Sequence, residues 1–125
     1  MVVLVVDDDA VSRLVIEHIL QGGKFATIAV ASAAEAAAVV HDPRRGIDLI
    51  VCDYLMPDAT GLDLLQQLRD QDSVAVPPFV LLTGISEADD LNDPRVQYLS
   101  GYLTKPVKSS ELLALAETIT QPAKN

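Results

Sequence analysis

The stretch Val2-Val3-Leu4-Val5-Val6-Asp7-Asp8-Asp9 decides the fold, because it is an unbroken apolar run that stops abruptly at three acids. A run that is apolar at every position is typical of a strand covered on both faces, as in the middle of a parallel sheet. The run over residues 47–52 is apolar except for Asp48 and ends at Asp53. We therefore expect two buried strands that each deliver carboxylates at their carboxyl ends.

Longer segments of helical character separate these short runs. The alternation predicts βα units, which most economically form an open, doubly wound α/β sheet of parallel strands with helices on both faces. The other expected strands are residues 27–30, 79–82 and 102–104, and the expected helices are residues 10–20, 33–41, 60–70 and a last one starting at Ser109 or Ser110.

Local signals bound most of these helices. Gly22 and Gly23 end the first one, at a point where a left-handed cap is easy. The segment Asn92-Asp93-Pro94 interrupts another helix, expected after Ser86, which makes that helix short, shifted or partly unwound. The start signals are N-cap residues with an acid three positions later: Ser32 with Glu35, Thr60 with Asp63, and Ser86 with Asp89.

Length and composition favour a single domain. The chain has 125 residues, of which 50% are apolar, so it can bury a proper core. Its net charge of −9 has the wrong sign for binding nucleic-acid phosphates or anionic lipid. No apolar run approaches the roughly 20 residues that span a bilayer. We expect residues 1–120 to form the domain and residues 121–125 to be a tail or the start of a linker.

The single cysteine, Cys52, cannot form an internal disulfide, and Met1 leads into an apolar run without the basic start of a secretory signal. A cytoplasmic, reducing location is therefore expected. Because Cys52 lies inside an apolar strand, we expect it to fill core space rather than take part in redox chemistry.

Polar residues follow four of the five predicted strands. Ligands of an open α/β sheet bind at the edge formed by the carboxyl ends of its strands, which is where these residues lie. Three carboxylates about 5 Å apart repel by about 3 kcal/mol per pair at an effective dielectric near 20, so a cation must compensate them. Mg²⁺ prefers such oxygen ligands, and a lysine adds a second positive charge. The set can therefore neutralise a phosphoryl group during transfer to a carboxylate. Its members are Asp7, Asp8, Asp53, Thr83 and Lys105.

With these residues in place, the chain resembles the receiver domain of two-component response regulators from Val2 to about Ile119. The resemblance implies a flavodoxin-like, five-stranded parallel sheet in the order 2-1-3-4-5. The motifs that carry it are Val-Val-Asp7-Asp8-Asp9, Cys-Asp53-Tyr-Leu-Met56-Pro57, Leu-Leu-Thr83-Gly84 and Gly101-Tyr102-Leu-Thr-Lys105-Pro106.

The resemblance also implies residue roles. Asp53 is expected to accept the phosphoryl group, and Thr83 and Lys105 to contact it. Tyr102 would be the switch aromatic, and the Lys105–Pro106 bond would be cis. The expected Mg²⁺ ligands are the carboxylates of Asp8 and Asp53, the backbone carbonyl of Leu55, and Asp7 through a bound water.

The implied activity is that of a signalling module in a phosphorelay, which catalyses only its own phosphoryl transfer and dephosphorylation. A histidine kinase or a histidine phosphotransfer protein would be the donor, and a weak homodimer is a further implied partner. The segment 93–99 departs from the alanine-rich helix end usual in the family, which affects the surface through which relatives dock partners.

Two alternatives remain beside this interpretation. Asp7-Asp8-Asp9-Ala10-Val11 also fits the first motif of haloacid-dehalogenase-like phosphatases, in which Asp7 would be the nucleophile. That family needs a later acidic motif, whereas only Glu111 and Glu117 follow Lys105. The other alternative is a pseudo-receiver that only binds partners, although every chemical position is filled.

The lifetime of the phosphorylated state depends on the path of the hydrolytic water. In the family, the side chains two positions after the phosphoacceptor and two after the threonine flank this path, and here they are Leu55 and Ile85. Neither side chain can hydrogen-bond a water, and both are bulky. We therefore expect a long-lived phosphorylated state for a receiver.

Overall fold

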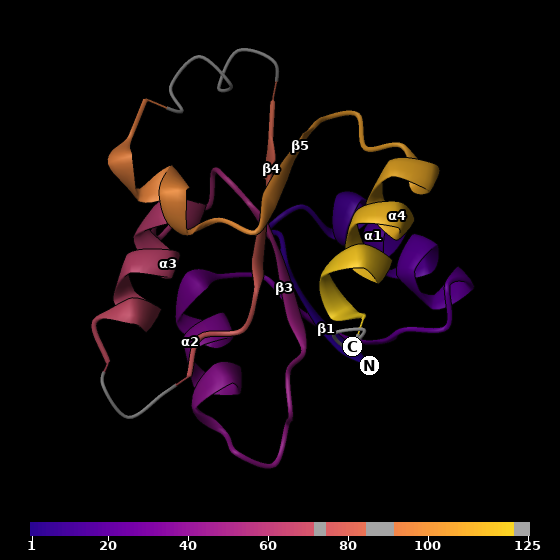
Figure 1. Cartoon of the computed structure of the whole chain (residues 1–125). Helices are drawn as coiled ribbons and strands as arrows, with labels where there is room; N and C mark the ends of the chain where they lie inside the picture. The colour runs from indigo at the N-terminus through magenta and orange to yellow at the C-terminus, as the bar shows by residue number, and fades with distance from the viewer. Residues whose placement is uncertain (72–74, 85–91, 122–125) are drawn as a thin grey trace.

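The computed structural model of the chain describes residues 1–71, 75–84 and 92–121. Its centre is a sheet of five parallel strands in the order β2-β1-β3-β4-β5, which confirms the predicted α/β architecture (Figure 1). The strands are β1 (Val2–Val6), β2 (Ala26–Val30), β3 (Leu49–Asp53), β4 (Phe79–Thr83) and β5 (Gly101–Thr104).

Helices cover both faces of this sheet. On one face lie α1 (Ala10–Gly22) and α4 (Ser109–Thr120), and on the other α2 (Ala33–His41), α3 (Gly61–Arg69) and a 3₁₀ helix, η2 (Pro94–Tyr98). No helix among the described residues combines the length and apolar character needed to cross a membrane.

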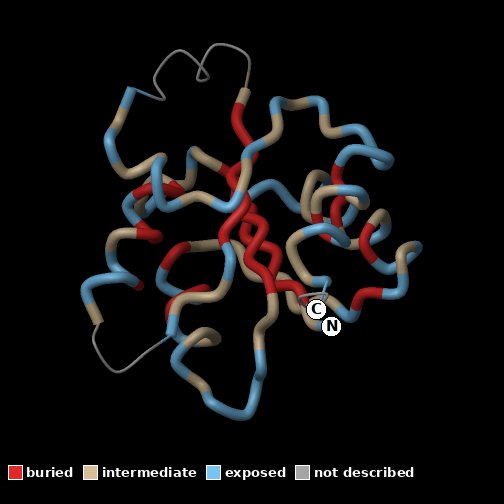
Figure 2. The backbone as a smooth tube through the Cα atoms, in the orientation of Figure 1, coloured by how far each residue is buried: buried red, intermediate tan, exposed pale blue. Residues whose placement is uncertain are grey.

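The central strands are apolar at every position because consecutive side chains enter different cores. Leu4 and Val6 of β1 belong to the core under α2 and α3, whereas Val3 and Val5 belong to the core under α1 and α4. Successive strand side chains point to opposite faces, so a strand with a core on each side has no solvent face. Figure 2 shows this as continuous burial along the middle of the molecule.

The predicted helix starts are confirmed where the structure describes them. The Ser32 hydroxyl accepts from the backbone N–H of Glu35, while the Glu35 carboxylate accepts from that of Ala31 rather than closing back on Ser32. Thr60 and Asp63 form a complete capping box at α3. The cap expected from Ser86 and Asp89 lies outside the described residues.

The expected left-handed cap at Gly22 and Gly23 is wrong. Gly22 is the last residue of α1, Gly23 has a φ of −90°, and it is Lys24 that adopts a positive φ of 71°. Gly23 instead lies close to α4, so that an added Cβ would require the end of the Leu113 side chain to shift. Glycine thus serves the close packing of two helices instead of the turn.

The apolar residues of α1 do not all face the core. Ile16 and Leu20 are buried, whereas Val11, Leu14 and Val15 are 70%, 68% and 50% exposed. The helix carries two overlapping apolar stripes, and only one packs against the sheet. The other forms an exposed apolar face next to the strand edge where the polar residues gather.

The helix expected after Ser86 lies outside the described residues, and after Asn92-Asp93 the structure has the short 3₁₀ helix η2. Asp93 is the N-cap residue of η2, where its side chain accepts from the N–H of Arg95, and Pro94 is the first residue of η2. The guanidinium of Arg95 then reaches α3, with Nη1 3.0 Å from Asp63 Oδ1. The short η2 is therefore tied to the start of α3.

Candidate functional site

The strand register brings the predicted site residues to one edge of the sheet. Asp53 is the last residue of β3, and the backbone N–H of the next residue, Tyr54, donates to the carbonyl oxygen of Leu82 on β4 at 2.9 Å. The N–H of Asp7 donates to Val30 O at 3.1 Å, and that of Lys105 donates to Thr83 O at 2.6 Å. Each residue thus stands at or just past the carboxyl end of its strand.

Three carboxylates meet at this edge. Asp7 is fully buried, Asp53 is buried and Asp8 is exposed, and each offers an oxygen that lies within 4.8 Å of the others. Asp7 Oδ1 accepts from the N–H of Asp9 at 2.9 Å, and the backbone carbonyl of Asp7 accepts from Arg13 Nη1 at 2.8 Å. Both contacts hold the loop after β1 in place.

Lys105 supplies the positive charge of the site. Its Nζ lies 3.0 Å from Asp53 Oδ1 and 3.6 Å from Asp7 Oδ2, and the Lys105–Pro106 bond is cis as expected. Burial lowers the pKa of Lys105, but the hydrogen bond with Asp53 and the charges of Asp53 and Asp7 outweigh it, so the pKa ends above its ordinary value. The lysine therefore stays charged.

Asp53 feels the opposite balance. Burial raises the pKa of its carboxyl, and the hydrogen bond and charge of Lys105 offset that rise only in part. Ionising Asp53 is thus disfavoured by desolvation and by the nearby Asp7 charge. Additional positive charge at this edge would favour the carboxylate.

The donor set fits a hard divalent cation. Within the described part of the chain, Asp7 Oδ2 is buried without a hydrogen-bond partner, at a site already crowded with carboxylates. Lys105 Nζ, 3.6 Å away, is beyond hydrogen-bond distance, so this buried oxygen keeps the capacity to bind a cation or to accept from a water. Carboxylate oxygens are the ligands that Mg²⁺ takes in proteins, usually together with several waters.

The two predicted switch residues lie on neighbouring strands. Thr83 is fully buried, and its hydroxyl has no hydrogen-bond partner among the described residues. Tyr102 is 55% exposed on the edge strand β5, where its register partner is Leu81. In this conformation the tyrosine side chain is therefore largely in solvent instead of filling space beside the site.

The loop between β3 and α3 carries the expected carbonyl ligand, Leu55, and a residue that sequence patterns did not single out. Leu55 is 51% exposed and forms an antiparallel bridge with Thr60. Asp58 accepts from the N–H groups of Ala33 and Ala34 at the start of α2. Nothing local marks this role, because the partners lie 24 and 25 positions earlier.

Arg13 was also missed, since a helix arginine gives no signal of a contact with Asp7. Ile85, which is expected to flank the path of the hydrolytic water together with Leu55, lies outside the described residues. The structure thus brings together Asp7, Asp8, Asp53 and Lys105 and leaves Tyr102 apart from them.

Comparison with known proteins agrees with this geometry. The model of the response regulator receiver domain matches residues 3–117. The two-component response regulator ORR3 of Oryza sativa subsp. japonica is 30% identical, over 94% of this chain and 88% of the relative. The two-component response regulator ARR3 of Arabidopsis thaliana is also 30% identical, over 98% of this chain and 57% of the relative.

Solved structures show the same likeness. The chemotaxis response regulator CheY4 of Vibrio cholerae superimposes with a TM-score of 0.81 at 27% identity, covering 94% of this chain and 97% of that structure. A putative response regulator from Chloroflexus aurantiacus J-10-fl gives a TM-score of 0.84 at 25% identity, covering 95% and 96%. The chain therefore belongs to the family of receiver domains of two-component response regulators.

Proposed function

We propose that Asp53 of this receiver domain accepts a phosphoryl group from a phosphohistidine donor. The observation that carries the proposal is the pairing of a buried carboxylate with a charged lysine at 3.0 Å, inside a carboxylate cluster at the strand edge. A nucleophile and the charges that stabilise a transferring phosphoryl group then share one site.

In the proposed transfer, an oxygen of Asp53 forms a bond to phosphorus while the bond between phosphorus and the donor histidine nitrogen breaks. The electron pair of that bond stays on the imidazole nitrogen, which takes up a proton from solvent. Lys105 and Thr83 contact the phosphoryl oxygens, since the ammonium neutralises charge and the buried hydroxyl has hydrogen-bonding capacity to spare.

The metal site is proposed for Mg²⁺. Asp8 and Asp53 would bind through carboxylates, Leu55 through its backbone carbonyl and Asp7 through a water. When bound, the ion neutralises charge on the phosphoryl oxygens and on the crowded carboxylates. Its addition favours ionised Asp53, whose pKa burial otherwise raises.

The response to phosphorylation is proposed to run through Thr83 and Tyr102. A phosphoryl group adds a charge of about −1.5 to −2 and three acceptor oxygens. The buried Thr83 hydroxyl gains a partner by moving toward them, and the exposed Tyr102 turns into the space that is left. The bias exists because the rearranged state binds the new charge better.

The exposed apolar face of α1 is proposed as the docking surface for a helix that carries the phosphohistidine. Val11 and Val15 of this face line a groove together with Lys105, Pro106 and Val107. Because Lys105 also contacts Asp53, a helix packed in the groove brings its own side chains next to the phosphoacceptor. The donor would be a histidine kinase or a histidine phosphotransfer protein.

We expect residues 1–120 to form the working unit, with residues 121–125 as a tail or the start of a linker, in the cytoplasm. The chemistry is limited to the domain's own phosphoryl transfer and dephosphorylation, and a weak homodimer is the proposed self-association.

The test is labelling with acetyl phosphate, followed by borohydride reduction of the acyl phosphate and mass spectrometry. We expect label at residue 53, loss of labelling in Asp53→Asn, and loss on chelation of Mg²⁺. Label at Asp7 would instead support a phosphatase-like nucleophile, and undiminished labelling of Asp53→Asn would overturn the assignment.

The donor surface is tested in the same assay with two donors. Leu14→Lys, on the exposed apolar face of α1, should slow transfer from a phosphorylated histidine phosphotransfer domain at least tenfold, because a lysine on an apolar interface must be desolvated. Labelling by acetyl phosphate should stay unchanged. Equal rates of transfer from the phosphotransfer domain to the parent and to Leu14→Lys would contradict the proposed docking surface.

A further inference from the structure

We infer that Asp58 is a positioning residue for the metal site, because it clamps the loop that carries the Leu55 carbonyl onto the start of α2. The inference rests on the proposed function, in which this carbonyl binds Mg²⁺. Asp58 itself is not part of the carboxylate cluster, which among the described residues contains Asp7, Asp8 and Asp53.

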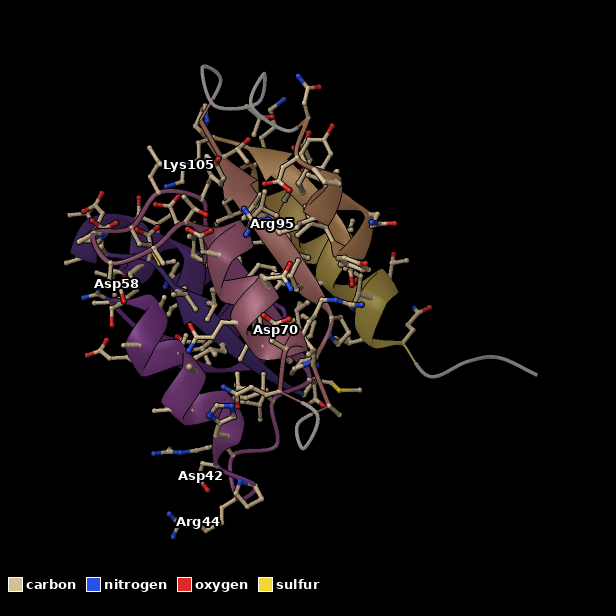
Figure 3. The ribbon with its side chains drawn as sticks, turned by 90° about the vertical axis from the view of Figure 1, so that its left-hand side faces the viewer. Asp42, Arg44, Asp58, Asp70, Arg95 and Lys105 are labelled. Carbon is tan, nitrogen blue, oxygen red and sulfur yellow. The ribbon has the colours of Figure 1, made fainter. Side chains whose placement is uncertain are left out.

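The clamp consists of two hydrogen bonds between distant segments. Asp58 Oδ1 accepts from the N–H of Ala33 at 3.2 Å, and Oδ2 accepts from the N–H of Ala34 at 3.1 Å. The first N–H groups of a helix have no partner within the helix, and a carboxylate there also meets the positive end of the helix dipole. Figure 3 shows Asp58 between its loop and the start of α2.

The pKa of Asp58 agrees with this geometry. Burial raises the pKa, but the backbone N–H groups of Ala33, Ala34 and Asp58 itself together lower it more, so the carboxyl titrates below its ordinary range. Asp58 therefore stays ionised at neutral pH and keeps both oxygens as acceptors. The neighbouring Ser32 hydroxyl takes the next N–H, that of Glu35, so the two residues divide the helix start.

The remaining contacts of the loop hold its base. Tyr54 accepts from the N–H of Gly61 at 2.7 Å, and Leu55 bridges to Thr60. Met56 and Ala59 pack against the core under α2 and α3. Asp58 adds a polar attachment of the loop tip to a separate element, which restricts how the loop, with the Leu55 carbonyl at its start, can shift.

A pre-positioned ligand binds a metal more tightly than one that must first be ordered, and residues that orient ligands typically contribute at least a factor of about ten to metal affinity. We expect Asp58→Ala to weaken Mg²⁺ binding by about three- to tenfold, since only one of the proposed ligands is affected. Phosphorylation by acetyl phosphate should slow at low Mg²⁺ and recover at saturating Mg²⁺.

Three control variants separate positioning from other effects. Asp58→Asn removes the charge but keeps one oxygen acceptor, so it should fall between the parent and Asp58→Ala. Ser32→Ala removes a cap of α2 without releasing the loop. Asp42→Ala removes a carboxylate that accepts a backbone N–H at the far end of α2 (Figure 3). The last two should bind Mg²⁺ like the parent.

The experiment is a calorimetric titration of each variant with Mg²⁺, together with amide hydrogen exchange at Ala33 and Ala34. Coupling between sites is reciprocal, so saturating Mg²⁺ should slow exchange of these two amides in the parent by up to the same factor that Asp58→Ala loses in affinity.

Parent-like affinity in Asp58→Ala would overturn the inference. So would an equal loss in Ser32→Ala, which would assign the effect to helix stability, or an equal loss in Asp58→Asn and Asp58→Ala, which would assign it to charge alone. A parent chain that does not bind Mg²⁺ would overturn the proposed metal site as well, whereas a parent that binds normally confines the failure to Asp58.

Discussion

The two halves of the strand edge are built differently. At the ends of β1 and β3, Asp7 is held by the N–H of Asp9 and the loop after β3 is closed by a bridge and by Asp58. At the ends of β4 and β5, the Thr83 hydroxyl has no partner among the described residues, and Tyr102 is mostly exposed. The loops of the first half are held by hydrogen bonds, although Asp7 Oδ2 itself has no hydrogen-bond partner among the described residues. The second half instead has an unbonded hydroxyl and an exposed ring.

This difference suggests a division of labour in the receiver domain. In the proposed function, the acidic half is the part that binds the cation and the phosphoryl group, and its preformed contacts lower the entropy lost on binding. The half at β4 and β5 is the part proposed to rearrange, because its unmatched groups can gain contacts in a second state. Lys105 joins the halves, since it follows β5 and contacts Asp53 and Asp7.

The largest effect is expected from Gly61→Ala, which disturbs the acidic half. A Cβ at this position would lie 2.5 Å from Leu81 Cδ1 and 2.9 Å from the backbone oxygen of Asp53, and the strand oxygen cannot move aside. Overpacking of this kind destabilises by about 1–3 kcal/mol. Urea unfolding measures it.

Gly22→Ala is the matched control, because nothing lies within 4 Å of its added Cβ at the end of α1. Alanine favours a helix over glycine by up to about 1 kcal/mol, so this variant should be neutral or more stable. Equal destabilisation by both substitutions would show that the close approach at Asp53 is unimportant.

The next effect concerns the lifetime of the phosphorylated state. Leu55→Asn places a group that can orient water near the acyl phosphate, without changing the proposed carbonyl ligand. We expect dephosphorylation to be about three- to tenfold faster. The rate is measured as the loss of label after the phosphoryl donor is removed. Leu14→Asn, also at an exposed leucine, is the control. Identical decay of the label in the parent, Leu55→Asn and Leu14→Asn would show that Leu55 does not obstruct the hydrolytic water.

The smallest effect is expected from Arg95→Ala, which removes the ion pair between η2 and α3 and the contacts of Arg95 with Asp93. The stacking of Arg69 on Tyr98 still joins the two elements. The Arg95–Asp63 pair is partly exposed, so its loss should destabilise by no more than about 1 kcal/mol. The N–H of Thr60 and then the Arg95 guanidinium hold the pKa of Asp63 below its usual range.

The sign of the pH dependence follows from that lowered pKa. The pair's contribution is complete above the unfolded carboxyl pKa of about 4 and is lost as pH falls through the lower folded pKa. The stability difference between parent and Arg95→Ala should therefore be full at pH 7 and shrink below about pH 4 in urea titrations. A difference that grows on acidification would be inconsistent with the pair.

The sequence predicted the parts of this molecule that depend on local pattern. Continuous apolar runs identified the buried strands, and Thr60 with Asp63 identified the start of α3. Because parallel strands share one polar edge, Asp7, Asp53 and Lys105 were grouped correctly before any coordinates. The resemblance supplied the cis bond before Pro106, which no pattern implies.

Features that depend on contacts between distant segments were not predictable. The role of Asp58 requires the loop after β3 to reach the start of α2, and Gly23 packs closely against Leu113, 90 positions later. The spacing of apolar residues in α1 did not show which stripe would pack against the sheet. Val11, Leu14 and Val15 recur at helical spacing, and so do Ile16 and Leu20, but only the second set is buried.

The division between the two halves is tested most directly by NMR of the chain with Mg²⁺ and beryllofluoride, which mimics the phosphoryl group. The account predicts shifts of the ligand-bearing residues with little change in the backbone around Asp9 and Thr60, together with larger changes at Thr83, Tyr102 and along β5. Changes confined to the immediate pocket, with Tyr102 and β5 unaffected, would contradict it.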